Sequence, residues 1–256
     1  MIDLKARLKA NKLTIGSWIT LASPAIPEIM ARCGFDWLTV DMEHSAITIE
    51  IAQDLIRIIG LSGVVPLVRV GKNDPNLIKR VMDAGAHGVI VPMVNSPEDA
   101  ERAVSAVKYP PVGKRGVGLA RAQGYGLEFG KYKNWVNKKS VVVVQVEHID
   151  AVESLEGILA TPGVDAFIVG PYDLSASLGR PGEFEHPDVK AALKEVISVS
   201  KRMNKCAGFH VIPPDSRLLA KKSEEGYRFL GFSLDTLFLG RSCMDETTAA
   251  RRKMRR

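Results

Sequence analysis

Two carboxylates stand at the ends of neighbouring apolar runs in this sequence. Glu147 closes the run that begins at Val141, and Asp173 follows the next run, Asp165 to Gly170. If both runs are adjacent strands of a parallel sheet, the two side chains lie close together at one edge. Oxygen ligands of this kind suit Mg²⁺ or Mn²⁺, with water and substrate filling the other positions. Asp173 could instead cap a helix, because it begins the pattern Asp-Leu-Ser-Ala-Ser, but the pair favours a metal site.

An arginine and a histidine also follow strand-like runs. Arg69 ends the apolar stretch Val-Val-Pro-Leu-Val, and an arginine there needs an anionic or carbonyl partner. A substrate would provide one, and a structural salt bridge with Glu147 or Asp41 is the alternative. His44 follows an acidic cluster and could be a general base held by a carboxylate, although a lone histidine is more often structural.

Two other routes to carbonyl chemistry find no support in the sequence. No lysine lies on the last residues of a strand-like run, whereas a Schiff-base aldolase needs a buried lysine with a lowered amine pKa. The zinc motif HExxH is absent, and zinc would require a cluster of His and Cys ligands. Carbonyl chemistry here would therefore use a divalent metal to polarise the carbonyl and to stabilise the enolate.

These side chains need a scaffold that gathers strand ends, and the apolar runs indicate which one. Most runs are continuously apolar, as in strands buried on both faces of a parallel sheet. The eight runs are Thr14 to Ile19, Trp37 to Asp41, Val65 to Val70, Gly88 to Met93, Val141 to Glu147, Asp165 to Gly170, Cys206 to Val211 and Arg228 to Leu234. Strand then helix, eight times, predicts a single (β/α)₈ barrel. An open doubly wound sheet is disfavoured, because no GxGxxG turn is present.

Starts and stops of the connecting helices are marked in the sequence. Three helices are predicted to begin with a capping side chain followed by proline at the first helical position. These starts are Ser23-Pro24, Asp74-Pro75 and Ser96-Pro97. Three helices are predicted to end at a glycine. These stops are Gly34, Gly60 and Gly85. Extra material enters at residues 108–140, where the stretch around 113–130 is interpreted as an ordered loop, and at residues 171–205.

Composition sets the outer limits. The chain has 256 residues, 46% hydrophobic and 25% charged, which is ordinary for a globular protein and excludes disordered and fibrous classes. The tail at residues 251–256 supplies five of the six net positive charges. Three separated cysteines, no signal peptide and no apolar segment of about 18 residues predict a soluble cytoplasmic protein. We expect one barrel domain over residues 1–256, ending in this basic tail.

Six segments in this order resemble the HpcH/HpaI family of metal-dependent pyruvate aldolases. The segments are Asp36 to His44, Pro66 to Arg69, Gly88 to Val94, Tyr109 to Gly118, Gln145 to Glu147 and Gly170 to Gly179. The resemblance extends from about residue 12 to 245. It implies cleavage of a 4-hydroxy-2-oxo acid into pyruvate and an aldehyde, with Mg²⁺, Mn²⁺ or Co²⁺ as cofactor. It also implies a homo-oligomer, a hexamer or trimer, in which neighbours exchange the last helix.

The resemblance assigns the metal site residue by residue. Glu147 and Asp173 would be the metal ligands, with Gln145 beside them. Asp41 and Glu43 would surround the metal's water ligands. These five residues are the metal site that the resemblance implies.

It also assigns the groups that act on substrate. Arg69 would contact the pyruvate carbonyl oxygen, where its charge would stabilise the developing enolate. His44 would handle the proton of the acceptor hydroxyl, with Asp83 as its orienting partner. The backbone N–H groups of Tyr172 and Asp173 would bind the pyruvate carboxylate at a helix N-terminus.

Two features depart from the family pattern. The stretch Leu119 to Gly126 and His210 do not resemble the forms expected for dicarboxylic substrates, so the acceptor aldehyde stays open.

The connection from Lys108 to Ser140 is also long, with 33 residues, and belongs to the barrel face opposite the chemistry. We hypothesise that it walls the acceptor pocket of a neighbouring subunit, where Arg121 meets an anionic substrate end. A surface loop with solvated arginines is the alternative.

Three other functions are alternatives to an aldolase. An oxaloacetate decarboxylase would use the same enolate site. A non-catalytic barrel docking through its basic tail to nucleic acid or membrane is disfavoured, because such a tail does not need Arg69, Glu147 and Asp173 at strand ends. We therefore expect neither partner. An acyl-CoA lyase is disfavoured because no additional helical segment would hold the long cofactor.

Overall fold

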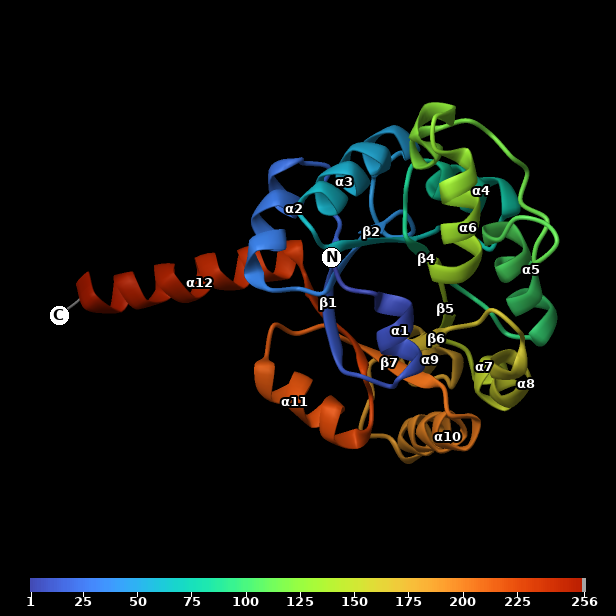
Figure 1. Ribbon diagram of the computed structural model, residues 1–256. Coiled ribbons are helices and arrows are strands. Elements are labelled where there is room, and N and C mark those ends of the chain that lie inside the picture. Colours follow the sequence, from blue (N-terminus) through green and yellow to red (C-terminus); the bar gives the residue numbers. More distant parts are fainter. Residues whose placement is uncertain (255–256) are drawn as a thin grey trace.

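Eight parallel strands close into a barrel in which each strand pairs with its neighbours in chain order (Figure 1). The structure, a computed structural model, describes residues 1–254. The strands are β1 (Thr14–Ile19), β2 (Trp37–Asp41), β3 (Val65–Arg69), β4 (Gly88–Val91), β5 (Val141–Val146), β6 (Ala166–Val169), β7 (Cys206–Val211) and β8 (Phe229–Leu234). Three coincide with the predicted runs, and the other five differ by one or two residues at their ends. The predicted (β/α)₈ barrel is confirmed.

A helical segment follows every strand. The helices after the strands are α2 (Ala25–Met30) with the short 3₁₀ helix η1 (Ala31–Cys33), α3 (Ile49–Leu61), α4 (Pro75–Asp83), α5 (Pro97–Val107), α7 (Ile149–Glu153) with α8 (Leu155–Ala160), α9 (Pro171–Ser177) with α10 (Pro187–Met203), α11 (Ser216–Glu225) and α12 (Asp235–Met254). A further helix, α1 (Leu4–Lys9), precedes β1. Its Leu4 and Leu8 pack with the side chains that fill the barrel, among them Trp37 and Phe229.

Helix starts and stops follow the sequence signals in part. Asp74 and Ser96 cap α4 and α5 as predicted, each accepting a backbone N–H three residues on. The prediction for Ser23 is wrong, because Pro24 occupies the N-cap position of α2 without a side-chain hydrogen bond. The prediction for Gly60 is also wrong: it lies inside α3, which continues to Leu61.

The long connection between β4 and β5 is built around a buried polar network. It carries the 3₁₀ segment η2 (Arg121–Gly126) and α6 (Phe129–Lys139), so much of it is helical. Arg115 donates to Asp83 at 2.5 Å and to the Tyr132 hydroxyl at 3.1 Å. Gln123, which is fully buried, donates to the Tyr109 hydroxyl at 2.7 Å. These bonds hold the connection against the end of α4.

The last helix, α12, extends away from the barrel (Figure 1). Its first residue, Asp235, is its only buried one, and its carboxylate accepts the backbone N–H groups of Thr20 and Leu21. The basic charges up to Lys253 lie on this exposed helix, whereas Arg255 and Arg256 lie outside the described residues. Across residues 1–254, every helix is too short or too polar to span a bilayer.

Close packing inside the barrel leaves no space for a side chain at Gly16. A Cβ at Gly16 would stand 2.0 Å from Cδ2 of Trp37, a fully buried ring that stacks on Phe229 at 4.3 Å. Because neither ring has room to move, we expect Gly16→Ala to lower the free energy of unfolding by about 1–3 kcal/mol. Urea unfolding measures the change. Gly130→Ala on α6 is the control, since beyond its own helix no atom lies within 4 Å of its Cβ position. Equal midpoints for the two variants would contradict the prediction.

Candidate active site

A cavity of about 140 Å³, here called the catalytic cavity, opens at the carboxyl ends of the strands. The predicted site residues that line it are His44, Arg69, Gln145, Tyr172, Asp173 and His210. Glu147 lies directly behind the wall, because its Oε2 is 3.2 Å from where a Cβ of the lining residue Gly170 would stand. Barrel closure therefore gathers side chains from five strand ends, as the sequence predicts for this fold.

Arg69, the last residue of β3, is held by Asp41, the last residue of β2. Its Nε donates to Oδ1 of Asp41 at 2.9 Å and its Nη2 donates to Oδ2 at 2.6 Å. The guanidinium also lies 4.4 Å from the ring centroid of Trp18. Although burial opposes it, the hydrogen bonds and charge of Arg69 hold the pKa of Asp41 below its ordinary value. The salt bridge weighed for Arg69 is thus present, and it fixes the guanidinium in the cavity wall with Nη1 not engaged by Asp41.

Glu43 adds a second carboxylate to the same arginine. Its Oε2 lies 3.3 Å from Nε of Arg69 but has no hydrogen-bond partner among the described residues. Burial raises the pKa of Glu43 to about 7, against the charge of Arg69 and reinforced by the charges of Glu147 and Asp173. This part of the site is therefore richer in negative charge than one guanidinium can balance.

Glu147 is oriented by two donors. The backbone N–H of Met93 donates to Oε1 at 2.7 Å, and the Gln145 amide donates to Oε2. Burial raises the pKa of Glu147, and the nearby charge of Asp173 adds to the rise. Met93, which has a left-handed φ of 50°, is a site residue that no sequence pattern predicted. Its place just beyond β4 is the signal that could have found it.

The carboxylates of Glu147 and Asp173 repel each other, and a divalent cation between them would remove that repulsion. Glu147 and Asp173 face each other's charge, and Gly170 leaves room beside Glu147 that a side chain would fill. In residues 1–254 no group of three or more His, Cys, Asp or Glu is arranged to hold a metal. Two carboxylates with the remaining positions left to water and substrate are nevertheless the donor set that Mg²⁺ uses in many enzymes.

His44 lies at the mouth of the catalytic cavity. Its side chain is 65% exposed, its Nε2 is 3.8 Å from Oε2 of Glu43, and its backbone N–H donates to Asp41 at 3.3 Å. The predicted partner Asp83 is not brought to it. Asp83 ends α4 at the opposite end of the barrel, where it binds Arg115 and Gln123. Within one chain, therefore, His44 and Asp83 do not form the predicted pair, and the catalytic role of Asp83 stays a prediction.

His210 is a half-buried member of the cavity wall. Its ring packs against Trp18 with centroids 4.9 Å apart, and its Nε2 lies 3.3 Å from the carbonyl oxygen of Ser233. Burial, with the charge of Arg69, lowers the pKa of His210 to about 3. Because His210 is neutral near neutral pH, it shapes the cavity and offers hydrogen bonds but does not supply positive charge.

Arg121 is the one predicted substrate-binding residue that lies away from the catalytic cavity of its own chain. Its Nη1 donates to the carbonyl oxygen of Ala84 at 3.0 Å, which ties η2 to the end of α4. Burial lowers the pKa of Arg121, assisted by the charge of Arg57. Its role toward a neighbouring subunit stays a prediction.

A closed (β/α)₈ barrel with carboxylates, an arginine and a histidine around a cavity at the carboxyl ends of its strands belongs to the barrel enzymes. The sequence profile of the HpcH/HpaI aldolase/citrate lyase family matches residues 14–239, and the chain belongs to this family. The resemblance noted in the sequence is confirmed.

Similar proteins of this family are named as aldolases. A hydroxypyruvate/pyruvate aldolase from Sagittula stellata is 39% identical over 236 residues, 92% of each chain. A 4-hydroxy-2-oxo-heptane-1,7-dioate aldolase from Escherichia coli is 37% identical over 97% of this chain and 94% of its own. The crystal structure of a family member from Burkholderia cenocepacia superposes with a TM-score of 0.93, at 35% identity and with 98% and 100% of the two chains covered. The chain is therefore a carbon–carbon lyase.

Proposed function

We propose that this protein is a divalent-metal-dependent aldolase that reversibly cleaves a 4-hydroxy-2-oxo acid into pyruvate and an aldehyde. One observation carries the proposal: Arg69, fixed by Asp41, shares a cavity with His44 and Asp173. This arrangement provides a fixed positive charge for an enolate oxygen, a base at the entrance and a carboxylate for a cation.

The cation would be held by Glu147 and Asp173. When bound, Mg²⁺ or Mn²⁺, with Co²⁺ as a third choice, would polarise the carbonyl at C2 of the substrate as a Lewis acid. Gln145 orients Glu147 through its amide. Asp41 and Glu43 would surround the cation's water ligands, and Glu43 has a buried Oε2 free to accept a hydrogen bond from one of them.

Different residues of the chain stabilise the developing charge and transfer the proton. In cleavage the hydroxyl at C4 loses its proton, the C3–C4 bond breaks, and C4 leaves as the aldehyde carbon. The bonding electron pair stays with the pyruvate part as an enolate, which is protonated at C3. Arg69 stabilises the oxygen at C2 of that enolate, and His44 accepts the C4 hydroxyl proton in cleavage and returns it in addition. The amide groups of Tyr172 and Asp173 would bind the carboxylate.

Proton exchange of pyruvate tests the proposal without knowledge of the aldehyde. The protein, loaded with Mg²⁺ or Mn²⁺, is incubated with pyruvate in D₂O, and the methyl signal is followed by proton NMR. We expect the signal to disappear at a rate proportional to the protein concentration. A rate no higher than that of the metal ion alone would contradict the proposed function.

His44 is expected to separate two reactions of the same enolate. His44→Ala should lower aldol cleavage by about 10²-fold or more, the usual worth of a positioned base. Decarboxylation of oxaloacetate should fall much less, because it has no acceptor hydroxyl to deprotonate. Steady-state rates of both reactions give the comparison, with His148→Ala, on a histidine outside the cavity, as control. Equal losses in the two reactions would refute the assignment of His44 as this base.

Oxaloacetate decarboxylation is the second candidate for the physiological reaction. Loss of CO₂ from oxaloacetate leaves the same pyruvate enolate, so Arg69 would serve both reactions. The exposed position of His44 at the cavity mouth favours aldol cleavage, because a base at the entrance faces an incoming aldehyde.

We also infer a homo-oligomer, a hexamer or trimer, in which a second copy covers α12. A 20-residue helix with one buried residue gains little from its own barrel, since most helix stability comes from tertiary packing. Residues Leu237 and Leu239 near its start are 38% and 56% exposed, which a neighbour would cover.

A further inference from the structure

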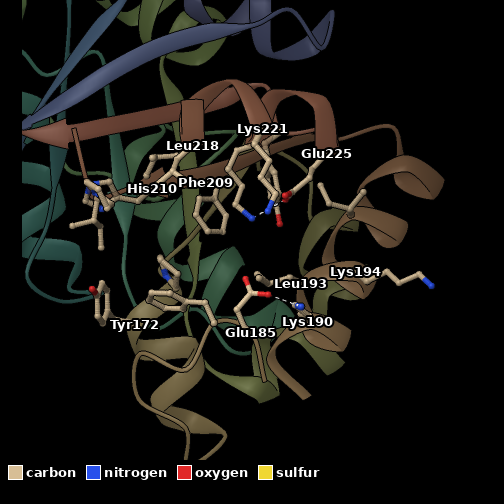
Figure 2. A pocket seen from close by; sticks show the side chains of 18 residues that line it. Tyr172, Glu185, Lys190, Leu193, Lys194, Phe209, His210, Leu218, Lys221 and Glu225 are labelled. Carbon is tan, nitrogen blue, oxygen red and sulfur yellow. Dashed lines mark hydrogen bonds and ion pairs between the residues drawn. The ribbon is translucent and has the colours of Figure 1, made fainter. Parts of the chain in front are cut away.

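A second and larger cavity lies beside the catalytic cavity. It measures about 520 Å³, against about 140 Å³, and is here called the α10–α11 cavity because those two helices form its sides. Both cavities are lined by Tyr172 and His210, so the two share a wall. Figure 2 shows the open space between Leu193 and Glu185 on one side and Leu218, Lys221 and Glu225 on the other.

The sequence of α11 explains why this space is not closed. A helix on a barrel normally buries an apolar stripe against the strands. In α11 no residue is buried, because the face toward the cavity carries lysines at positions 221 and 222 between Leu218 and Glu225. The strand β7 provides the cavity floor, because its Phe209 lines the space between α10 and α11. The lysines on this face of α11 thus leave the space between α10 and α11 open.

The lining combines an apolar body with a positive end. Phe184, Leu193, Ile197, Phe209 and Tyr227 are among its apolar residues. Lys222 lies 4.4 Å from the ring centroid of Phe209 and pairs with Glu225 at 2.7 Å, and Lys190 pairs with Glu185 at 2.6 Å. Lys194 and Lys221 form no ion pair within residues 1–254, but the side chain of Lys194 points away from the cavity (Figure 2). Lys221 therefore gives the cavity an uncompensated positive charge.

We propose that the α10–α11 cavity is the binding site for the distal part of the acceptor aldehyde, and that it selects an apolar chain ending in an anionic group such as a carboxylate. The inference rests on the proposed function and names the substrate class for that site. Tyr172 packs edge-on against Phe184 at 5.0 Å, and the two rings stand where a chain would pass from one cavity into the other. The last helix of a second copy fits poorly, because its end is basic, with Arg251, Arg252 and Lys253, and would meet the lysine side of the cavity.

The experiment compares acceptors of matched length in the addition of pyruvate. The probes are 8-oxooctanoate, octanal and acetaldehyde, and kcat/KM is measured for each. We expect 8-oxooctanoate to exceed octanal by about fivefold, the value of one partly exposed ion pair. Lys221→Met should abolish that preference and leave acetaldehyde unchanged. Lys133→Met, an exposed lysine on α6, is the matched control and should alter nothing.

Filling the cavity tests the apolar part. Leu193→Trp should lower kcat/KM for both eight-carbon acceptors about tenfold, as expected when a fitted hydrophobic site loses its space, with no effect on acetaldehyde or on pyruvate proton exchange. Ile197→Trp, one turn along α10, provides a second fill in case the first variant folds poorly. Both side chains are half-buried, so the larger ring has room to leave the core undisturbed.

The outcomes separate this inference from the proposed function. Loss of pyruvate exchange in the wild-type protein would overturn both. Normal exchange and acetaldehyde addition, together with eight-carbon rates that neither tryptophan variant changes, would overturn the acceptor site alone. A change of sedimentation coefficient in Leu193→Trp would overturn it too, since the cavity would then be an interface between copies of the chain.

Discussion

Glu147→Gln and Asp173→Asn should each lower aldol cleavage by at least about 10³-fold, because a divalent cation supplies several kcal/mol of charge stabilisation in the transition state. Both substitutions keep the shape of the side chain and remove one negative charge. Gln at position 147 can still accept the backbone N–H of Met93, which now lies 2.7 Å from Oε1. We therefore expect the fold to persist while the cation is lost.

A readout other than activity makes this prediction specific. Mn²⁺ should raise the melting temperature of the wild-type protein, since a ligand that binds only the folded state stabilises it. The same concentration should leave both variants unchanged, and titration followed by electron paramagnetic resonance should show free Mn²⁺. Glu153→Gln, on the exposed end of α7, is the control. Tight Mn²⁺ binding with near wild-type turnover in either variant would show that the ligands are assigned wrongly.

Much of the barrel could be predicted because its strands are buried on both faces. Val141 to Val146 is apolar at five of six positions, and all six are buried. A continuous apolar run of this length therefore predicts a strand of a parallel sheet directly. The helix stops were harder, because a glycine such as Gly60 is tolerated inside a helix, here one residue before its end at Leu61. Local signals say where a helix can end, whereas tertiary contacts decide where it does.

The site residues at strand ends could be placed for the same reason. Arg69 and Asp41 end adjacent strands and pair in register, so barrel geometry alone brings them together. Asp83 could not be placed by that logic. It ends a helix, and its partner Arg115 lies in the long connection, whose path no strand periodicity encodes. The charged face of α11 could have been noticed, since Lys221, Lys222 and Glu225 stand together in its sequence.

Arg69→Ala should lower both aldol cleavage and pyruvate proton exchange by about 10²–10³-fold, because each needs charge at the enolate oxygen. The variant also removes the partner of Asp41, a carboxylate only 2% exposed. An unpaired buried charge costs about 3–5 kcal/mol of stability. A loss of activity could then reflect unfolding, and the single variant does not separate the two causes.

The double variant Arg69→Ala with Asp41→Asn separates them. Asp41→Asn removes the unpaired negative charge. The double variant should therefore regain most of the unfolding free energy that Arg69→Ala loses, as measured by urea unfolding. Activity should not recover, because the guanidinium that stabilises the enolate oxygen at C2 is still missing. The single variant Asp41→Asn should act through position alone: it keeps the charge of Arg69 but loses the two bonds at 2.9 and 2.6 Å that orient it. We expect a smaller fall in kcat than for Arg69→Ala, with KM little changed. If the stable double variant exchanges pyruvate protons at the wild-type rate, Arg69 serves only to balance Asp41.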